Sequence, residues 1–180
     1  FAEEHGIRAY GSLEQMLSDS DTHMIDVCVP SFLNEEFCLK ITEAKKHVFL
    51  EKPIAFTMEA AKRMIGSAVE NGVRLMVGQV LRFCPEFIRI KELYDNGTLG
   101  DISHIYAARL RQMPAEDWYC DPQKSGGTLL NLMLHDIDFL HYLLGKPASV
   151  YCTAHNEGMN GCNDVMSIFR FACGTNAVIQ

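Results

Sequence analysis

The sequence lacks any apolar run long enough to cross a membrane, and it lacks a glycine-rich GxGxxG loop. Every apolar stretch falls well short of the roughly 18 residues that a membrane span needs. Gly66, Gly72 and Gly78 are spaced six apart, but they fall at a helix end and at strand flanks and form no such loop. We therefore expect no membrane partner.

A surplus of positive charge is also missing. With 16 Lys and Arg residues against 23 Asp and Glu residues, the formal net charge is -7. Proteins that bind nucleic acid neutralise phosphates with clustered basic side chains, so we expect no nucleic-acid partner. The 180 residues are 48% hydrophobic and 22% charged, which is typical of a globular chain with one domain or two small ones.

The seven cysteines include no CxxC pair, and their odd number argues against a complete disulfide framework. Cys28 and Cys38 lie inside short apolar runs, Val27–Val29 and Phe37–Leu39. We expect reduced, buried thiols and a cytoplasmic location. The chain has no initiator Met and no signal peptide, and it stops inside the strand-like run 177–180. It is therefore expected to be a fragment. Without a phosphate loop to hold a pyrophosphate, the fragment by itself is expected to be inactive.

Strands and helices alternate in the first part of the chain. Short apolar segments predict strands, and apolar positions at helical spacing between them predict helices. Thr57 is expected to cap the second helix, whose buried face is Ala61, Met64, Ile65 and Ala68, and Asn71-Gly72 to end it. The predicted elements are strands at 24–29, 47–50 and 73–77, with helices from Leu33 to Ala44 and after Thr57.

This alternation predicts an α/β fold with a parallel sheet of βαβ units. Such a sheet binds ligands at the carboxyl ends of its strands. The residues of interest are therefore those that follow the strands, at 30–34, 51–53 and 78–83.

The pattern changes after about residue 83. Longer strands joined by turns predict an α+β domain with a large, mainly antiparallel open sheet. The expected elements are a helix at 85–94, a strand at 102–111, a polar loop at 113–123, a helix at 126–144, strands at 150–155 and 165–171, and a further strand after Cys173-Gly174.

Three polar residues form a stripe on the apolar helix at 126–144. Asn131 and His135 are four residues apart and Asp138 is three further on, within roughly a 60° arc. Such side chains usually form an internal hydrogen-bond network, and from the helix alone we favour that interpretation. A metal site is less favoured, because Asn is a poor zinc ligand and no second His or Cys lies at ligand spacing.

Lys52 lies at the exit of the strand 47–50, in the sequence Glu51-Lys52-Pro53. A lysine at such an exit is most often a solvated charge. The ligand-binding edge of a parallel sheet favours a functional role here, and Pro53 allows a cis peptide bond.

The Glu51-Lys52-Pro53 segment and the segment from Gly126-Gly127 to His135-Asp136-Ile137-Asp138, at this separation, resemble the Gfo/Idh/MocA family of NAD(P)-dependent oxidoreductases. The resemblance covers essentially the whole chain. It implies a partial Rossmann domain at 1–82 that binds NAD or NADP, and a partial C-terminal domain at 83–180 for substrate binding and oligomerisation. It further implies a homo-oligomer, a dimer or tetramer, formed through the C-terminal sheet. The family's phosphate loop and ribose-reading acidic residue would lie upstream of Phe1.

The resemblance also implies roles for single residues. Lys52 would lie beside the nicotinamide and the substrate hydroxyl, with His135 across from it as acid/base. Asn131 stands where relatives usually carry Asp, and an amide positions substrate but takes no proton. Asn34 replaces the His of many relatives, and we expect little consequence. The cofactor side would be lined by Pro30, Ser31, Asn34, Glu51, Lys52, Pro53, Gln79 and Arg82.

The implied reaction is hydride transfer between a nicotinamide and the CH–OH group of a sugar or polyol. His135, with an ordinary histidine pKa near ~6.5, would accept the hydroxyl proton while Lys52 stabilises the developing alkoxide. Asp138 would orient His135 or be purely structural.

Other polar and aromatic side chains are weaker candidates. Trp118 and Tyr119 are candidates for the face of a sugar, or for simple packing. Arg109 and Arg111 would reach a ligand carboxylate or solvent. The alternative function is a non-catalytic NAD(P)-binding redox sensor, because Asn131 replaces the usual Asp. A third interpretation, a purely structural module, has only the buried helix in its favour.

Overall fold

The structure is a computed structural model that describes residues 1–19, 21–111, 117–155 and 164–180. The chain divides into two compact units, each with its own sheet. Unit 1 comprises Phe1–Val29 and Leu33–Val77, and unit 2 comprises Pro30–Phe32 and Gly78–Gln180.

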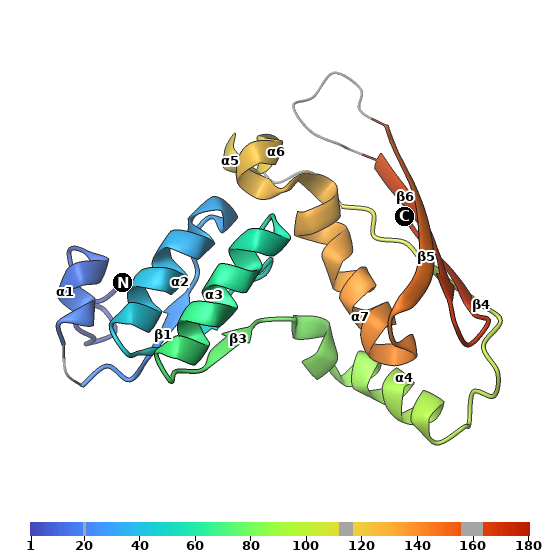
Figure 1. Cartoon of the computed structure of the whole chain (residues 1–180), viewed down its shortest axis with the longest axis horizontal. Helices are drawn as coiled ribbons and strands as arrows, with labels where there is room; N and C mark the ends of the chain where they lie inside the picture. Colours follow the sequence, from blue (N-terminus) through green and yellow to red (C-terminus); the bar gives the residue numbers. More distant parts are fainter. Residues whose placement is uncertain (20, 112–116, 156–163) are drawn as a thin grey trace. The chain divides into compact units, whose positions relative to one another are not determined.

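Unit 1 is built on a parallel three-stranded sheet in the order β1-β2-β3. Its strands are β1 (Met24–Val27), β2 (His47–Leu50) and β3 (Leu75–Val77). The crossover helices α2 (Asn34–Glu43) and α3 (Met58–Glu70) lie side by side (Figure 1). A short helix, α1 (Leu13–Leu17), precedes β1, and one 3-10 turn, η1 (Ser31–Leu33), leads into α2. The predicted parallel sheet is confirmed.

Local signals set the ends of α3 as predicted. The Thr57 hydroxyl accepts a hydrogen bond from the Ala60 amide at 3.1 Å. Asn71 ends the helix, and Gly72 takes a positive φ of 67° that favours glycine. The prediction that Ile65 is buried is wrong, because its side chain is 50% exposed. Met64 and Ala68 face the core, and Ile65 lies about 100° around the helix from Met64.

Alternate strand residues build the core of unit 1. Ile25, Val27, Val48 and Leu50 point to the helix side, where they pack with residues of α2 and α3. The residues between them point to the other face, where Met24 is 61% exposed.

The same alternation corrects the prediction for the cysteines. Cys38 on α2 is fully buried, as predicted. Cys28 is exposed, because it continues the outward parity of Met24 and Asp26 beyond the end of β1. An apolar run suggested burial on both faces, whereas the described residues of unit 1 cover the face of this sheet that carries Ile25, Val27, Val48 and Leu50. Cys152 and Cys173 of unit 2 are exposed as well.

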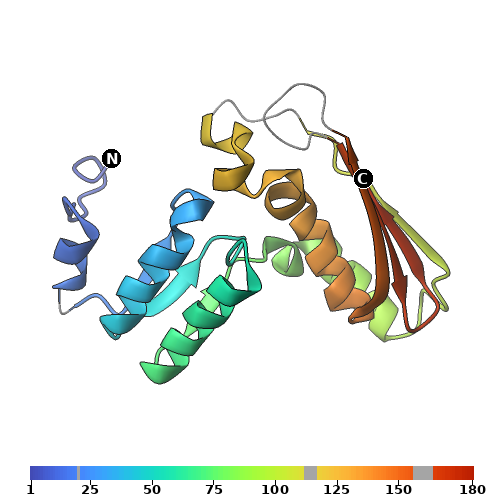
Figure 2. The ribbon, with the colours of Figure 1, turned by 45° about the horizontal axis from the view of Figure 1, so that its top comes forward.

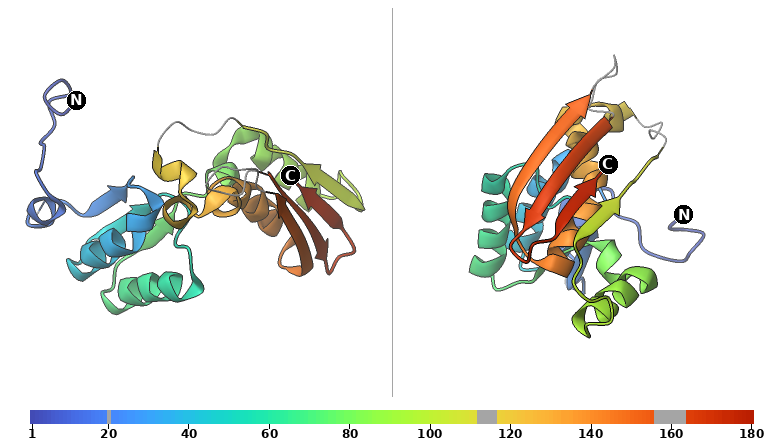
Figure 3. Two further views of the ribbon diagram at one scale, coloured as in Figure 1. Left: turned by 90° about the horizontal axis from the view of Figure 1, so that it is seen from above. Right: turned by 90° about the vertical axis from the view of Figure 1, so that its right-hand side faces the viewer.

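Unit 2 is built on a four-stranded sheet in the order β4-β7-β6-β5. Two pairings, β5 with β6 and β6 with β7, are antiparallel, whereas β4 and β7 are parallel. The mainly antiparallel sheet is thus confirmed, with one parallel pair at an edge (Figure 3). Its strands are β4 (His104–Ala107), β5 (Pro147–His155), β6 (Asp164–Phe171) and β7 (Asn176–Ile179).

The helix expected over 126–144 is helical from Gly127 to Leu144 and includes a π-helical segment. Gly126 and Gly127 have φ values of 77° and 67°, which end the short helix α6 (Pro122–Ser125). A π-helical segment, η3 (Leu129–Met133), then leads into α7 (Leu134–Leu144), as Figure 2 shows. The remaining elements are η2 (Val80–Phe83), α4 (Pro85–Asp95) and α5 (Asp117–Cys120). The start of the predicted loop at 113–123 lies outside the described residues.

The core of unit 2 forms between η3, α7 and one face of the sheet. Met133 and Leu140 pack there against Phe169, Phe171 and Ile179. The opposite face of the sheet exposes apolar side chains, among them Tyr106, Tyr151 and Ile168. No helix in the described part of the chain is long and apolar enough to span a membrane.

Candidate functional site

Lys52 lies directly after β2, at the carboxyl end of the parallel sheet of unit 1. The Glu51 amide still donates to the Val27 carbonyl at 3.1 Å, which continues the pairing with β1. The Lys52 amide then donates to the Glu51 carboxylate at 3.2 Å. The Lys52–Pro53 peptide bond is cis, and Pro53 is fully buried. The turn therefore leaves the sheet at the edge where such sheets bind ligands.

Asn34 makes a contact that the sequence did not predict. It is the first residue of α2, and its side chain is 1% exposed. Its amide nitrogen donates to the Glu51 carbonyl at 3.2 Å and to the Pro53 carbonyl at 2.8 Å. The structure thus brings Asn34, Glu51, Lys52 and Pro53 together within unit 1.

The helical pair Asn131 and His135 belongs to unit 2. Asn131 lies in the π-helical segment η3, and His135 is the second residue of α7; both side chains are half-buried. The α-helical spacing assumed for the stripe holds from His135 to Asp138 but not through η3, where the turns are wider. Segments of this kind often occur at functional sites.

The structure shows Asp138 with a different partner from the one we considered. Arg82 donates to both of its carboxylate oxygens, at 2.8 Å from Nε and 2.6 Å from the terminal nitrogen. The Arg82 guanidinium also lies 5.0 Å from the centre of the Tyr142 ring. The hydrogen bond to Asp138 raises the pKa of Arg82. Both residues are therefore used in joining η2 to α7, which favours the structural role of Asp138.

Arg109 likewise has a protein partner. It donates to both oxygens of Asp136 at 2.8 Å, and this hydrogen bonding raises its pKa. Arg109 was expected to reach a ligand carboxylate or solvent; the structure pairs it with the Asp136 carboxylate and leaves its side chain 31% exposed. Sequence reasoning missed Asp136, although a carboxylate within an apolar helix already required a partner. Asp136 and Asp138 lie on either side of Ile137 in α7, and their two arginine partners hold this helix in place. His135 directly precedes Asp136 in the chain.

The other predicted residues belong to unit 2. Gln79 directly precedes η2, and its side-chain oxygen is buried with no hydrogen-bond partner among the described residues. The Trp118 and Tyr119 rings of unit 2 stack on each other with centroids 3.8 Å apart. Pro30 and Ser31 are half-buried, and Ser31 begins η1.

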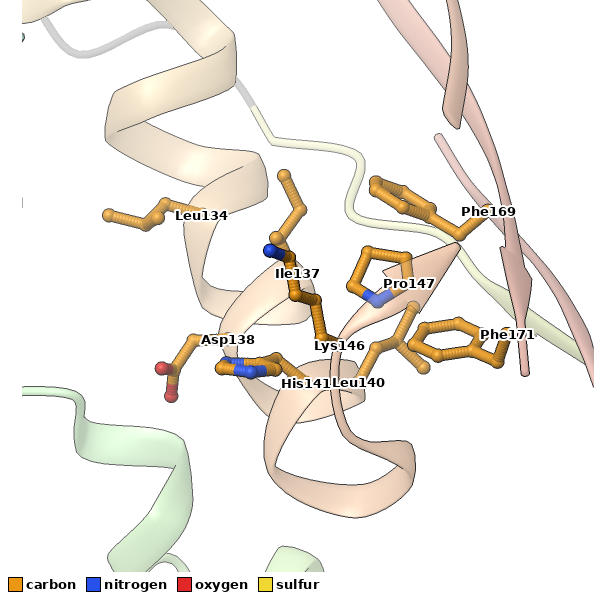
Figure 4. Close-up of a pocket in the computed structure, with 9 residues that line it drawn as sticks. All are labelled: Leu134, Ile137, Asp138, Leu140, His141, Lys146, Pro147, Phe169 and Phe171. Carbon is orange, nitrogen blue, oxygen red and sulfur yellow. The ribbon is translucent and has the colours of Figure 1, made fainter. Parts of the chain in front are cut away.

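A cavity of about 360 Å³ lies within unit 2 between α7, the start of β5 and β6 (Figure 4). Its walls are mainly apolar, with Leu140, Phe169 and Phe171 among them, and Asp138 and His141 contribute polar groups. Neither Asn131 nor His135 lines it. In the described part of the chain, no group of three or more His, Cys, Asp or Glu side chains is arranged to hold a metal ion.

A parallel βαβ unit followed by an α+β unit is the arrangement of an oxidoreductase family with an NAD-binding Rossmann fold. Two family models match this chain. Residues 1–79 match the model described as an oxidoreductase family with an NAD-binding Rossmann fold, and residues 87–180 match the GFO/IDH/MocA C-terminal domain. The chain belongs to the GFO/IDH/MocA family.

Individual relatives support this membership. Over 180 residues the chain is 31% identical to a myo-inositol 2-dehydrogenase of Thermotoga maritima, covering 96% of the chain and 53% of that relative. It is also 31% identical to a 1,5-anhydro-D-fructose reductase of Ensifer adhaerens, over 98% of the chain and 56% of the relative. The chain spans about half the length of the curated relatives it matches.

The fold also matches solved structures of dehydrogenases. The WlbA dehydrogenase of Bordetella pertussis, solved with NADH and UDP-GlcNAcA, matches with a TM-score of 0.88 at 26% identity. The match covers 99% of this chain and 58% of that one.

Proposed function

We propose that the intact protein transfers a hydride between a nicotinamide cofactor and the CH–OH group of a sugar or polyol. The observation that carries the proposal is the place of Lys52 at the carboxyl end of β2, in a turn that the Asn34 amide holds through the Glu51 and Pro53 carbonyls. A cation there is suited to bind the oxygen of a reacting alcohol. The relatives named for inositol and anhydrofructose support this substrate class.

The chain's residues fit a nicotinamide cofactor in one specific respect. The Gln79 side-chain oxygen is a buried acceptor that meets no donor among the described residues, and a bound group with an N–H would satisfy it. Pro30, Ser31, Glu51, Lys52 and Pro53 would hold the rest of the nicotinamide side. We give Arg82 a structural role instead, because Asp138 occupies its guanidinium. Bound NAD⁺ or NADP⁺ would supply the hydride acceptor.

Each of the three catalytic candidates has a separate task. Lys52 donates a hydrogen bond to the substrate oxygen and stabilises its negative charge as it develops. His135 accepts the hydroxyl proton as general base. Asn131 binds a substrate hydroxyl through its amide and takes no proton. Trp118, stacked on Tyr119, is the candidate to contact the apolar face of the sugar.

The test compares Lys52→Ala and His135→Ala in the intact protein with a substrate found in a sugar and polyol panel. Loss of a positioned acid/base group typically costs about 10²- to 10⁴-fold, so we expect turnover to fall by at least ~100-fold in each variant. His141→Ala is the matched control, because His141 lies on the same helix but is exposed. Near-normal turnover in both variants would contradict the proposal. Tight NAD(P)H binding without oxidation of any panel member would instead support the regulatory alternative.

We further propose a cytoplasmic location and a homo-oligomer formed through the unit 2 sheet. The location is supported by six free cysteines among the described residues, as expected in a reducing compartment. The oligomer is supported by the apolar residues on the exposed face of the sheet.

A further inference from the structure

Asn34 holds the backbone on both sides of Lys52. We propose that Asn34 is a positioning residue, whose buried amide fixes the Glu51–Lys52–Pro53 turn and thereby the direction in which the Lys52 ammonium group points. The inference rests on the proposed function, because Lys52 has its catalytic task only there.

The hydrogen bonds bracket the lysine. The Asn34 amide nitrogen donates to the Glu51 carbonyl, at 3.2 Å, and to the Pro53 carbonyl, at 2.8 Å. One planar group thus sets the separation of the Glu51–Lys52 and Pro53–Ile54 peptide units, and Lys52 lies in the short segment between the two acceptors. The backbone segment that carries the Lys52 side chain is thereby held in place.

The chemistry of the contact requires a donor. Both carbonyls accept from the same nitrogen, while the Asn34 side-chain oxygen is buried and meets no donor among the described residues. A carboxylate of the same shape would face two carbonyl oxygens and repel them. A leucine of similar size would leave both carbonyls without this partner.

The position of Asn34 makes the contact rigid. It begins α2, and this helix packs into the core of unit 1 through Cys38 and Ile41, both fully buried. The turn that carries Lys52 is therefore tied to the core and does not depend on its own contacts alone. This is the support that a catalytic group on a loop needs to keep a fixed geometry.

A buried polar residue can also serve stability alone, and Thr42 provides the comparison. It lies on the same helix, is fully buried, and its hydroxyl is 2.7 Å from that of Ser67, on α3. Thr42→Val removes a buried hydrogen bond of unit 1 without touching the Lys52 turn. It is thus the matched control for Asn34→Leu.

The first measurement is amide hydrogen exchange of the intact protein. In Asn34→Leu we expect exchange in a peptide covering residues 51–56 to rise by at least about tenfold, while peptides from α3 change little. Thr42→Val should leave the 51–56 peptide unchanged. Unaltered exchange of that peptide in Asn34→Leu would overturn the proposal.

The second measurement is a double-mutant cycle on turnover. Asn34→Leu should lower kcat at least about tenfold in the wild-type background but less than about twofold when Lys52 is already Ala, because it acts through Lys52. Asn34→His, which restores a donor, should recover part of the loss. Equal costs in both backgrounds would mark a merely structural role and overturn the proposal. If Lys52→Ala itself leaves turnover unchanged, the proposed function fails, and hydrogen exchange alone decides whether Asn34 fixes the turn.

Discussion

Single residues show most clearly how unit 1 holds its candidate catalytic group. The Asn34 amide, the buried ring of Pro53 and the edge of β2 together determine where Lys52 leaves the sheet. Cys38, one turn along α2 from Asn34, lies in the core that supports this arrangement. The environment of its thiol gives a test of that core that does not depend on activity.

Burial raises the pKa of the Cys38 thiol from its ordinary value of 9.0 to about 11. The unfolded chain therefore releases this proton at lower pH than the folded one, and the unfolding free energy falls as pH rises through that range. We expect Cys38 to contribute a loss on the order of 1–3 kcal/mol between these two values. Urea unfolding of wild type and Cys38→Ala at a series of pH values checks this. Parallel pH curves for the two proteins would contradict the assignment.

At the scale of elements, α7 is fixed by two bidentate ion pairs. Arg82 binds Asp138 and Arg109 binds Asp136, so η2 and the segment after β4 hold the helix that carries His135. The two acidic side chains are each only 11% exposed. Removing one partner of such a pair leaves a largely desolvated charge, which costs more than losing a surface ion pair.

Arg109→Met keeps most of the aliphatic stem but leaves Asp136 without its partner. Because Arg109 is 31% exposed, we discount the cost of breaking a fully buried pair and expect a loss of about 1–3 kcal/mol in unfolding free energy. Arg89→Met is the control, because the Arg89–Glu92 pair is 64% and 57% exposed. That change should cost less than about 0.5 kcal/mol. Equal effects in denaturant titrations would show that the Arg109 pair does not fix α7.

Sequence patterns predicted some elements well and others poorly. The limits of α3 follow from Thr57 and from Asn71-Gly72, whose effects are local. The π-helical turn at Asn131 and the parallel pairing of β4 with β7 depend on tertiary packing, so no local pattern revealed them. The pairing of Arg109 with Asp136 joins residues 27 positions apart. Lys52 was predicted from its place after a strand, but its support by Asn34 required the fold.

At the scale of the whole molecule, the open face of the unit 2 sheet is the candidate oligomer interface. Strand pairing aligns Tyr106, Val178, Ile168 and Tyr151 in one row across all four strands. Tyr106 is 65% exposed, Ile168 is 44% exposed and Tyr151 is 68% exposed. A contiguous apolar row on an exposed sheet is typical of a protein–protein interface.

Ile168→Glu should dissociate the oligomer of the intact protein, because it buries a charge in that row. Light scattering should then give the mass of a smaller species. Val69→Glu is the control, since Val69 is 75% exposed on α3 of unit 1. An unchanged mass for Ile168→Glu would exclude this face as the interface.

The transfer of a deuterium label from substrate to cofactor distinguishes hydride transfer from other reactions. A substrate from the sugar and polyol panel, deuterated at its reacting carbon, is incubated with the intact protein and NAD⁺ or NADP⁺. The reduced cofactor is then analysed by mass spectrometry. We expect deuterium on the nicotinamide ring with the wild-type protein, and little or none with Lys52→Ala or His135→Ala. Reduced cofactor without deuterium, or product formed without reduced cofactor, would contradict hydride transfer.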